Sequence, residues 1–334
     1  MQARQEPTGS WADAHEIEAM LEMRSSDALA SWLADRLGSR FPRAQRRILR
    51  VYPGKAARVK GAGEHSAFSI LDPSLQDPPV SVGLDVPLVE AIRARMPLTV
   101  SACSGGMRLL AALSCGGEVR YLVELTGDIP AGGAAALSDF VGIVAKYFER
   151  LGDAETDPLT RLFNRRIFQT HVETGLRRWI DSGRAHFFAV MDIDHFKRIN
   201  DGFGHLYGDE ILVLFSNLMR KTFRAGDLLY RFGGEEFVVV YGVEAGRGGT
   251  EAPDRFRAAV EGFEFPGVGR VTVSCGFTRI ADASTPVATL IDRADQALYY
   301  AKSRGRNRVC SWDSLVAAGE LKPPAAANRD VTLF

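Results

Sequence analysis

Phe187-Phe-Ala-Val-Met-Asp-Ile-Asp194 places two carboxylates at the end of a run of five apolar residues. A short apolar run of this kind is typical of a buried strand. A second stretch, Arg231-Phe-Gly-Gly-Glu-Glu-Phe-Val-Val-Val-Tyr241, places two more carboxylates after the turn Gly233-Gly234 and before another apolar strand. Carboxylates at the end of a buried strand are costly to ionise unless they are paired or bind a cation. We therefore expect the two clusters to converge on one oxygen-rich site suited to Mg²⁺. The alternative for either cluster alone is a solvated acidic loop.

The residues around these two stretches predict one α+β domain. Further strands are expected at 228–232 and 271–277, and helices at 165–180, 207–223, 253–261 and 287–303. Helices packed around a single sheet with a central hairpin define this class.

The first half of the chain predicts a smaller α+β domain with an antiparallel sheet. Apolar residues recur at helical spacing from His15 to Leu37, and Ser25-Ser26-Asp27 breaks this pattern, with Ser26 or Asp27 as the expected cap. Strands are expected at 47–52, 108–114 and 119–126, and a helix at 87–95. Gly116-Gly117 predicts a hairpin between the last two strands.

A longer helix is expected at 133–152. Its apolar residues follow an a/d pattern over two heptads: Leu137, Phe140, Val144, Tyr147 and Leu151. Two interpretations stay open, because the same stripe suits a core-facing helix of the first domain or a dimerising connector.

Composition narrows the class of protein. The chain has 334 residues, 46% of them hydrophobic and 25% charged, as expected for two globular domains. With 41 basic and 41 acidic residues it has no net charge, so no global field would hold it on nucleic acid or a membrane. The four scattered cysteines fit a reducing compartment, and no apolar leader or membrane span is evident, so we expect a cytoplasmic location.

Residues 157–313 resemble the GGDEF domain family, the diguanylate cyclases. Five stretches carry the resemblance, in family order and at family spacing: Asp157-Pro-Leu-Thr-Arg-Leu-Phe-Asn-Arg-Arg166, Asp192-Ile-Asp-His-Phe-Lys-Arg-Ile-Asn-Asp201, Gly204-His-Leu-Tyr-Gly-Asp209, Arg231-Phe-Gly-Gly-Glu-Glu-Phe237 and Ala301-Lys-Ser-Arg-Gly-Arg-Asn307. The signature here reads Gly-Gly-Glu-Glu-Phe, and the family tolerates Glu at the position of Glu235.

The resemblance implies a palm-like sheet and a defined reaction. Two GTP-loaded domains of a homodimer face each other, and each 3′-hydroxyl attacks the α-phosphate of the other GTP. The products are cyclic di-GMP and two pyrophosphates. The resemblance also implies Mg²⁺ as the cofactor, with Mn²⁺ as a possible substitute.

The resemblance also assigns roles to individual residues. The implied metal ligands are Asp192, the carbonyl of Ile193, Glu235 and Glu236, the two glutamates also being the catalytic pair, with Glu235 drawing the proton from the 3′-hydroxyl. The implied substrate contacts are Lys302, Arg306 and the main chain of His195, Phe196 and Lys197 for the phosphates, and Asn200 and Asp209 for guanine. The remaining pair, Arg224 and Asp227, matches the RxxD site at which cyclic di-GMP inhibits the family. The alternative for this last pair is a surface ion pair.

The order of elements in residues 15–130 resembles a GAF sensor domain. We therefore expect a tail at 1–14, a GAF-like domain with an unknown ligand at 15–130, a connector helix at 131–156, the cyclase domain at 157–314 and a tail at 315–334. Two other functions are compatible with the family: a cyclic di-GMP receptor without catalysis, and a scaffold. The complete set of acidic and basic site residues favours the enzyme.

Overall fold

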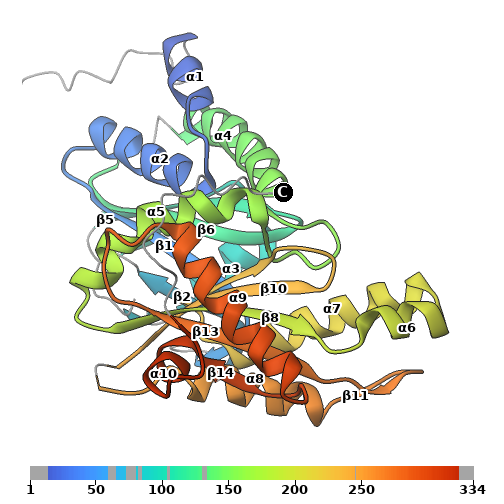
Figure 1. Cartoon of the computed structure of the whole chain (residues 1–334). Coiled ribbons are helices and arrows are strands. Elements are labelled where there is room, and N and C mark those ends of the chain that lie inside the picture. Colours follow the sequence, from blue (N-terminus) through green and yellow to red (C-terminus); the bar gives the residue numbers. More distant parts are fainter. Residues whose placement is uncertain are drawn as a thin grey trace, which may run out of the picture. The chain divides into compact units, whose positions relative to one another are not determined.

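The structure, a computed structural model, describes residues 14–58, 65–72, 80–81, 85–103, 106–129, 134–244 and 246–322. The chain divides into two compact units, Met1–Glu155 and Thr156–Phe334 (Figure 1). Most of the expected N-terminal tail, and all but 315–322 of the C-terminal one, lie outside the described residues.

The first unit is built on a six-stranded sheet in the order β3-β2-β1-β6-β5-β4. Its strands are β1 Gln45–Arg58, β2 His65–Asp72, β3 Val80–Ser81, β4 Leu98–Cys103, β5 Gly106–Cys115 and β6 Glu118–Gly127. All neighbouring strands are antiparallel, which confirms the predicted kind of sheet. The β5–β6 hairpin turns at Gly116 and Gly117, whose φ angles of 59° and 74° suit glycine.

Helices cover both faces of this sheet. Helices α1 Ala14–Leu21, α2 Ser26–Arg40 and α4 Ala134–Glu155 share one core with it, and α3 Val86–Ala94 packs on the opposite face. The N-cap of α2 is Ser25, which accepts a hydrogen bond from the main-chain N–H of Ala28 at 3.2 Å. The prediction that Ser26 or Asp27 caps this helix is therefore wrong, because both residues already lie in its first turn. The Ser26 N–H donates to Glu155 Oε1 at 2.7 Å.

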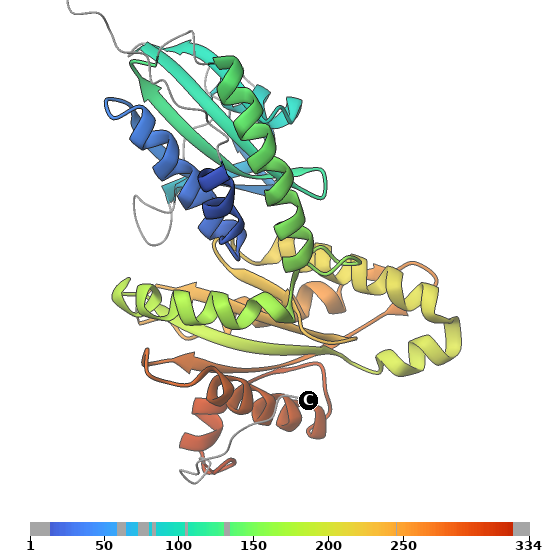
Figure 2. The ribbon, with the colours of Figure 1, turned by 90° about the horizontal axis from the view of Figure 1, so that it is seen from above.

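The apolar stripe of α4 packs inside the first unit. Leu137, Phe140 and Val144 are at most 3% exposed and belong to the core shared with α2 and the sheet. Tyr147 and Leu151 are partly buried against the same core, and Figure 2 shows α4 lying along the sheet. The interpretation of these residues as a dimerisation seam is therefore wrong, because their own domain already covers them.

The second unit is built on a sheet in the order β14-β13-β8-β10-β9-β7. Its strands are β7 Phe163–Asn164, β8 Ala185–Ile193, β9 Leu228–Arg231, β10 Glu236–Val243, β13 Val273–Ile280 and β14 Val309–Ser311, and a separate hairpin pairs β11 Glu264–Phe265 with β12 Gly269–Arg270. The central strand β8 is antiparallel to β10 and β13, and all nine of its residues are buried. The outer pairs β13–β14 and β7–β9 are parallel.

Alternate residues of β8 point to two separate cores. Phe187, Ala189 and Met191 pack with α7 His205–Thr222 and α8 Glu251–Glu261. The neighbours Phe188 and Val190 pack on the other face, with α5 Arg165–Asp181 and α9 Val287–Ser303. A mainly antiparallel sheet with helices on both faces confirms the predicted α+β class.

Two short helices complete the second unit. Helix α6 Phe196–Phe203 follows β8, and α10 Trp312–Ala317 follows β14. The predicted start of the C-terminal tail at residue 315 is too early, because α10 continues to Ala317 and Ser311 caps it by accepting from the N–H of Ser314 at 3.3 Å.

Helix α9 lies unusually close to strand β13 at Gly276. A Cβ atom on Gly276 would lie 2.1 Å from both the carbonyl oxygen of Ala294 and the main-chain nitrogen of Leu298. Neither contact can be relieved by a side-chain rotation, since both atoms are main chain. The absence of a side chain at Gly276 thus sets the distance of α9 from the sheet.

We expect Gly276→Ala to destabilise the second unit by about 1–3 kcal/mol or more, because α9 would have to move away from the sheet. Denaturant unfolding measures the loss. Gly142→Ala is the matched control, since nothing lies within 4 Å of a Cβ on this helical glycine, and it should stabilise the chain slightly. An equal stability of Gly276→Ala and the unaltered chain would contradict the close packing.

Candidate active site

The two acidic clusters meet at one end of the central sheet. Asp192, near the end of β8, is directly opposite Glu236, the first residue of β10. The N–H of Ile193 donates to the carbonyl of Glu235 at 3.4 Å, so the signature turn is joined to the end of β8. The predicted convergence of the two stretches is therefore confirmed.

Lys302 supplies a cation at the same place. It lies on the last turn of α9, and its Nζ is 2.8 Å from Oδ2 of Asp192. The side chain of Asp192 is 7% exposed and that of Lys302 is 32% exposed. The pair is possible because Asp192 is on the face of β8 that α9 covers, with Phe188 and Val190.

The carboxylates of this site are held in an environment that disfavours their charge. Burial raises the pKa of Asp192, with Lys302 opposing this effect and Glu236 and Asp194 adding to it. Burial and the neighbouring Asp192 also raise the pKa of Glu235. Two partly desolvated carboxylates, each with a pKa raised by burial and by neighbouring acidic groups, form a site that gains from a bound cation. Among the described residues, no group of three or more His, Cys, Asp or Glu side chains is already placed to hold a metal ion.

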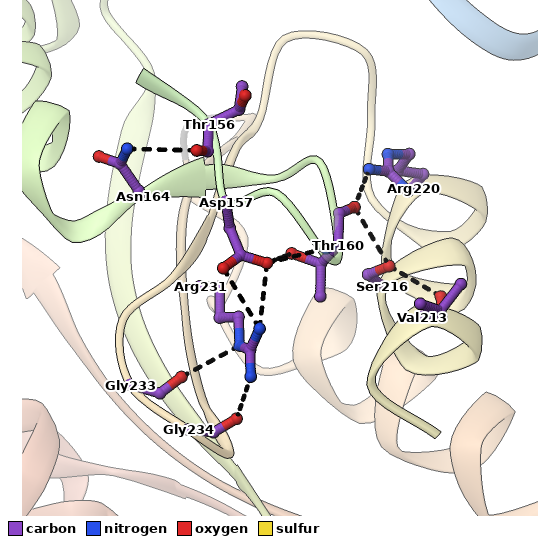
Figure 3. Close-up of polar contacts among 10 residues, drawn as sticks. All are labelled: Thr156, Asp157, Thr160, Asn164, Val213, Ser216, Arg220, Arg231, Gly233 and Gly234. Atoms are coloured by element: carbon purple, nitrogen blue, oxygen red, sulfur yellow. Dashed lines mark hydrogen bonds and ion pairs between the residues drawn. The ribbon is translucent and has the colours of Figure 1, made fainter. Parts of the chain in front are cut away.

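Arg231 holds the signature turn, Gly233-Gly234, in place through hydrogen bonds to its main chain (Figure 3). Its guanidinium donates to the carbonyls of Gly233 and Gly234 at 3.2 and 2.9 Å, and to both oxygens of Asp157 at 3.1 and 3.2 Å. Asp157 also accepts from the N–H and hydroxyl of Thr160 at 2.8 and 2.7 Å. Burial works against the charge of Asp157, but hydrogen bonds from Thr160 and Arg231 lower its pKa overall. The planar fork of an arginine suits this set of acceptors.

The carbonyl of Thr160 connects this hydrogen-bond network to helix α7. It accepts hydrogen bonds from Arg220 and from the hydroxyl of Ser216, both on α7 (Figure 3). Arg231 and Asp157 stand within the motif stretches of the sequence, but no role was predicted for them. Nothing local in the sequence indicates that Arg231 and Asp157 bind each other, because they are 74 residues apart along the chain.

The predicted phosphate contacts lie in two segments. His195, with φ of 60°, leads into α6, and its side chain makes no capping hydrogen bond. The first main-chain N–H groups of α6, at Phe196 and Lys197, have no acceptor within the helix, as at any helix start. Arg306 is half-buried in the loop after α9, four residues beyond Lys302.

The predicted guanine contacts lie where α6 meets α7. A Cβ on Gly208 would be 1.9 Å from Oδ1 of Asn200, so the Asn200 amide lies against the main chain of α7. Asp209 is the next residue of α7 and is exposed. Oδ1 of Asn200 is buried and has no hydrogen-bond partner within the described part of the chain. A buried acceptor of this kind calls for a donor from outside the chain.

Arg224 and Asp227 lie in the turn between α7 and β9. Asp227 Oδ2 accepts from the main-chain N–H of Arg224 at 2.7 Å, and the Asp227 N–H donates to the Arg224 carbonyl at 3.1 Å. The side chain of Asp227 thus shapes the turn, and Arg224 is exposed, as the sequence predicts for a surface site.

Comparison with known proteins gives a consistent result. Residues 154–308 match the family described as "Diguanylate cyclase, GGDEF domain". Diguanylate cyclase DgcP of Pseudomonas aeruginosa is 42% identical over 159 residues, which are 47% of this chain and 24% of that protein. Response regulator PleD of Caulobacter vibrioides is 39% identical over 161 residues, 47% of this chain and 36% of that protein.

A solved structure gives a partial match. It contains the coiled coil and GGDEF domain of DgcB from Caulobacter crescentus in complex with c-di-GMP, and it is 30% identical in sequence. The match covers 53% of this chain and 98% of the DgcB chain, with a TM-score of 0.46. The chain spans well under two thirds of the length of the two curated relatives.

Residues 154–308 therefore match the GGDEF domain family, which confirms the resemblance seen in the sequence for this part of the chain. Within the described ranges, none of the helices combines the length and the apolar character that a membrane span requires.

Proposed function

We propose that this chain is a diguanylate cyclase that condenses two GTP molecules into cyclic di-GMP and two pyrophosphates. In each half-reaction a bond forms between the 3′-oxygen of one GTP and the α-phosphorus of the other, and the bond to pyrophosphate breaks. The observation that carries the proposal is the convergence of Asp192, Glu235 and Lys302 at the signature turn of a GGDEF domain.

The donor set fits a divalent cation. Asp192 and Glu235 would hold Mg²⁺ or Mn²⁺, with Glu236 and the carbonyl of Ile193 as further oxygen ligands. Such an ion, when bound, supplies positive charge against the triphosphate during nucleotidyl transfer. The raised pKa values of Asp192 and Glu235 support this assignment, since a cation would offset the cost of their charge.

The chain's own residues would orient the nucleotide. Lys302, Arg306 and the N–H groups at the start of α6 are suited to the phosphates. The carboxylate of Asp209 can accept two N–H bonds from guanine, and the unpaired Oδ1 of Asn200 can accept another. Glu235 is also the candidate base for the 3′-hydroxyl, as the family resemblance implies.

The reaction requires two copies of the domain, since each binds one GTP and the product contains two nucleotides. We propose a homodimer for this reason, without the apolar stripe of α4 as its interface. We also propose that the first unit is a GAF-like domain that controls the cyclase through an unknown ligand.

We expect Asp209→Ser to relax base selection, lowering the preference for GTP over ATP by at least about tenfold, because the paired acceptor for guanine N–H groups is lost. Competition between the two nucleotides measures the ratio of kcat/KM. Glu210→Ser, which changes the next and also exposed residue of α7, is the control. An unchanged ratio in Asp209→Ser would place the guanine contact elsewhere.

We propose that Arg224 and Asp227 bind cyclic di-GMP and that this binding inhibits the enzyme. The exposed guanidinium of Arg224 can donate two parallel hydrogen bonds to a phosphate or to a guanine edge. Substrate and product would then act at two distinct sites, which is the requirement for allosteric inhibition.

We expect the progress curve of the unaltered enzyme to slow as product accumulates, and that of Arg224→Ala to stay linear for longer. Arg279→Ala removes an exposed arginine near the end of β13 and serves as the control. Identical curves, together with no cyclic di-GMP binding to either protein in calorimetry, would contradict the inhibitory site. Arg224 and Asp227 would then only shape the turn between α7 and β9.

The proposed function is tested by incubating the purified chain with GTP and Mg²⁺ and separating the nucleotides by chromatography. We expect cyclic di-GMP to form. Unchanged GTP at high protein concentration, with Mn²⁺ tried as well, would contradict the proposal.

A further inference from the structure

Asp194 is the second carboxylate of the strand end, and its contacts differ entirely from those of Asp192. It is 4% exposed. Its Oδ1 accepts from the hydroxyl of Ser274 at 2.7 Å, and its Oδ2 accepts from the hydroxyl of Thr272 at 2.7 Å and from the main-chain N–H of Asn307 at 3.0 Å. The Asp194 N–H also donates to the Thr272 carbonyl at 2.9 Å. The carboxylate is therefore committed to donors of the protein itself.

The loop that Asp194 holds is strained. Gly305, Arg306 and Asn307 follow one another with φ angles of 110°, 63° and 44°. Residues other than glycine rarely adopt positive φ angles. Consecutive residues keep such angles only when the surrounding structure holds them. The loop lies between the end of α9 and β14, and it carries Arg306.

Asn307 is fixed on its side chain as well as on its main chain. Its Nδ2 donates to Oε1 of Glu261 at 2.8 Å, and its Oδ1 accepts from Arg257 at 3.1 Å. Arg257 also pairs with Glu261 at 2.7 Å. Asp194 on one side and these α8 residues on the other thus determine the backbone that presents Arg306.

We propose that Asp194 is a positioning residue that fixes Arg306 for the triphosphate of GTP, an inference that rests on the proposed function. Two carboxylates at the end of β8, two residues apart, then serve two parts of the site. Asp192 binds the cation, and Asp194, directly after the strand, holds the phosphate-binding loop. The competing possibility is that Asp194 is itself a metal ligand, which its three internal donors argue against.

The test compares Asp194→Ala, Arg306→Ala and the double variant in the full chain. The probe is guanosine 5′-(α,β-methylene)triphosphate with saturating Mg²⁺, because its methylene bridge prevents release of pyrophosphate. Calorimetry gives the dissociation constant, and steady-state kinetics with GTP gives KM and kcat separately.

We expect Asp194→Ala to weaken probe binding and raise KM about tenfold, with a smaller change in kcat. Because Asp194 acts through Arg306, the double variant should bind no more weakly than Arg306→Ala alone. Asp194→Asn should restore most of the affinity, since its amide oxygen can still accept from the Asn307 N–H.

A matched control separates positioning from general stability. Asp313 accepts from the N–H of Arg279 at 2.9 Å and from the hydroxyl of Thr278 at 3.3 Å, at the opposite end of β13. We expect Asp313→Ala to lower the melting temperature without changing probe affinity. If Asp194→Ala does not fold, Asn307→Ala loosens the same loop from the α8 side and carries the same prediction.

Three results would overturn the inference: affinity of Asp194→Ala equal to that of the unaltered chain, additive losses in the double variant, or a loss in Asp194→Asn that is restored by Mg²⁺ above the concentration that saturates the unaltered chain. The last would identify a metal ligand. If the unaltered chain binds the probe but makes no cyclic di-GMP, the proposed activity fails while the positioning role is still measured. If it does not bind the probe, both are overturned.

Discussion

Asp192→Asn is expected to abolish nearly all cyclic di-GMP synthesis while leaving the fold intact. The change removes one carboxylate ligand but keeps the shape of the side chain. Losing part of the charge stabilisation in the transition state at about 3–4 kcal/mol corresponds to a fall in kcat of about 10²–10³-fold. Product formation from GTP measures this effect. Asp313→Asn, at the far end of the sheet, should keep full activity.

The same variant should be at least as stable as the unaltered chain when no metal is present. Burial raises the pKa of Asp192, so the folded protein binds this proton more tightly than the unfolded chain does. The stability of the unaltered chain therefore rises as the pH falls through the raised pKa of the folded state toward the lower pKa of the unfolded chain. The amide in the variant has no such proton to bind, so the difference in melting temperature should narrow on acidification. A large loss of stability in Asp192→Asn at neutral pH would contradict a raised pKa of Asp192 in the folded state.

Lys302→Met should reduce both activity and stability. The variant loses a phosphate contact and also leaves Asp192 buried without its cation. We expect kcat/KM to fall by about 100-fold, equal to about 3 kcal/mol of lost transition-state binding. Because the Lys302 side chain is 32% exposed, we expect a stability loss of about 2 kcal/mol, below that of a fully buried pair.

The pH dependence of this stability loss identifies its cause. Lys302 lowers the pKa of Asp192, so its removal raises that pKa further. The lost stability should therefore return as the pH falls through the pKa of the folded state, where Asp192 becomes neutral. Lys146→Met, at an exposed position of α4, is the control and should change neither quantity. A pH-independent loss in Lys302→Met would point to packing in place of the ion pair.

The paired acidic clusters could be predicted because their signals are local. Apolar runs ending in carboxylates, and a Gly-Gly turn before a strand, specify β8 and β10 without knowledge of the rest of the chain. Their register, with Asp192 opposite Glu236, is known only from the structure, because antiparallel pairing alone leaves the register open. The α+β class follows from the same periodicities.

The sequence could not reveal the contacts that depend on distant parts of the chain. The partners of Asp194 lie 78, 80 and 113 residues away, and nothing local distinguishes this carboxylate from Asp192. The a/d stripe of α4 suits a dimer seam or a domain core equally, and only the packed sheet of the first unit decides between them. The need for glycine at Gly276 likewise depends on the approach of α9.

The most direct test of the central claim is the stoichiometry of the reaction. Pyrophosphate and cyclic di-GMP are measured in the same samples of the unaltered chain with GTP and Mg²⁺, and Asp192→Asn is run alongside. We expect two pyrophosphates for each cyclic di-GMP, and neither product in the variant above trace levels. Release of phosphate and GDP, or equal yields from the two proteins, would contradict it.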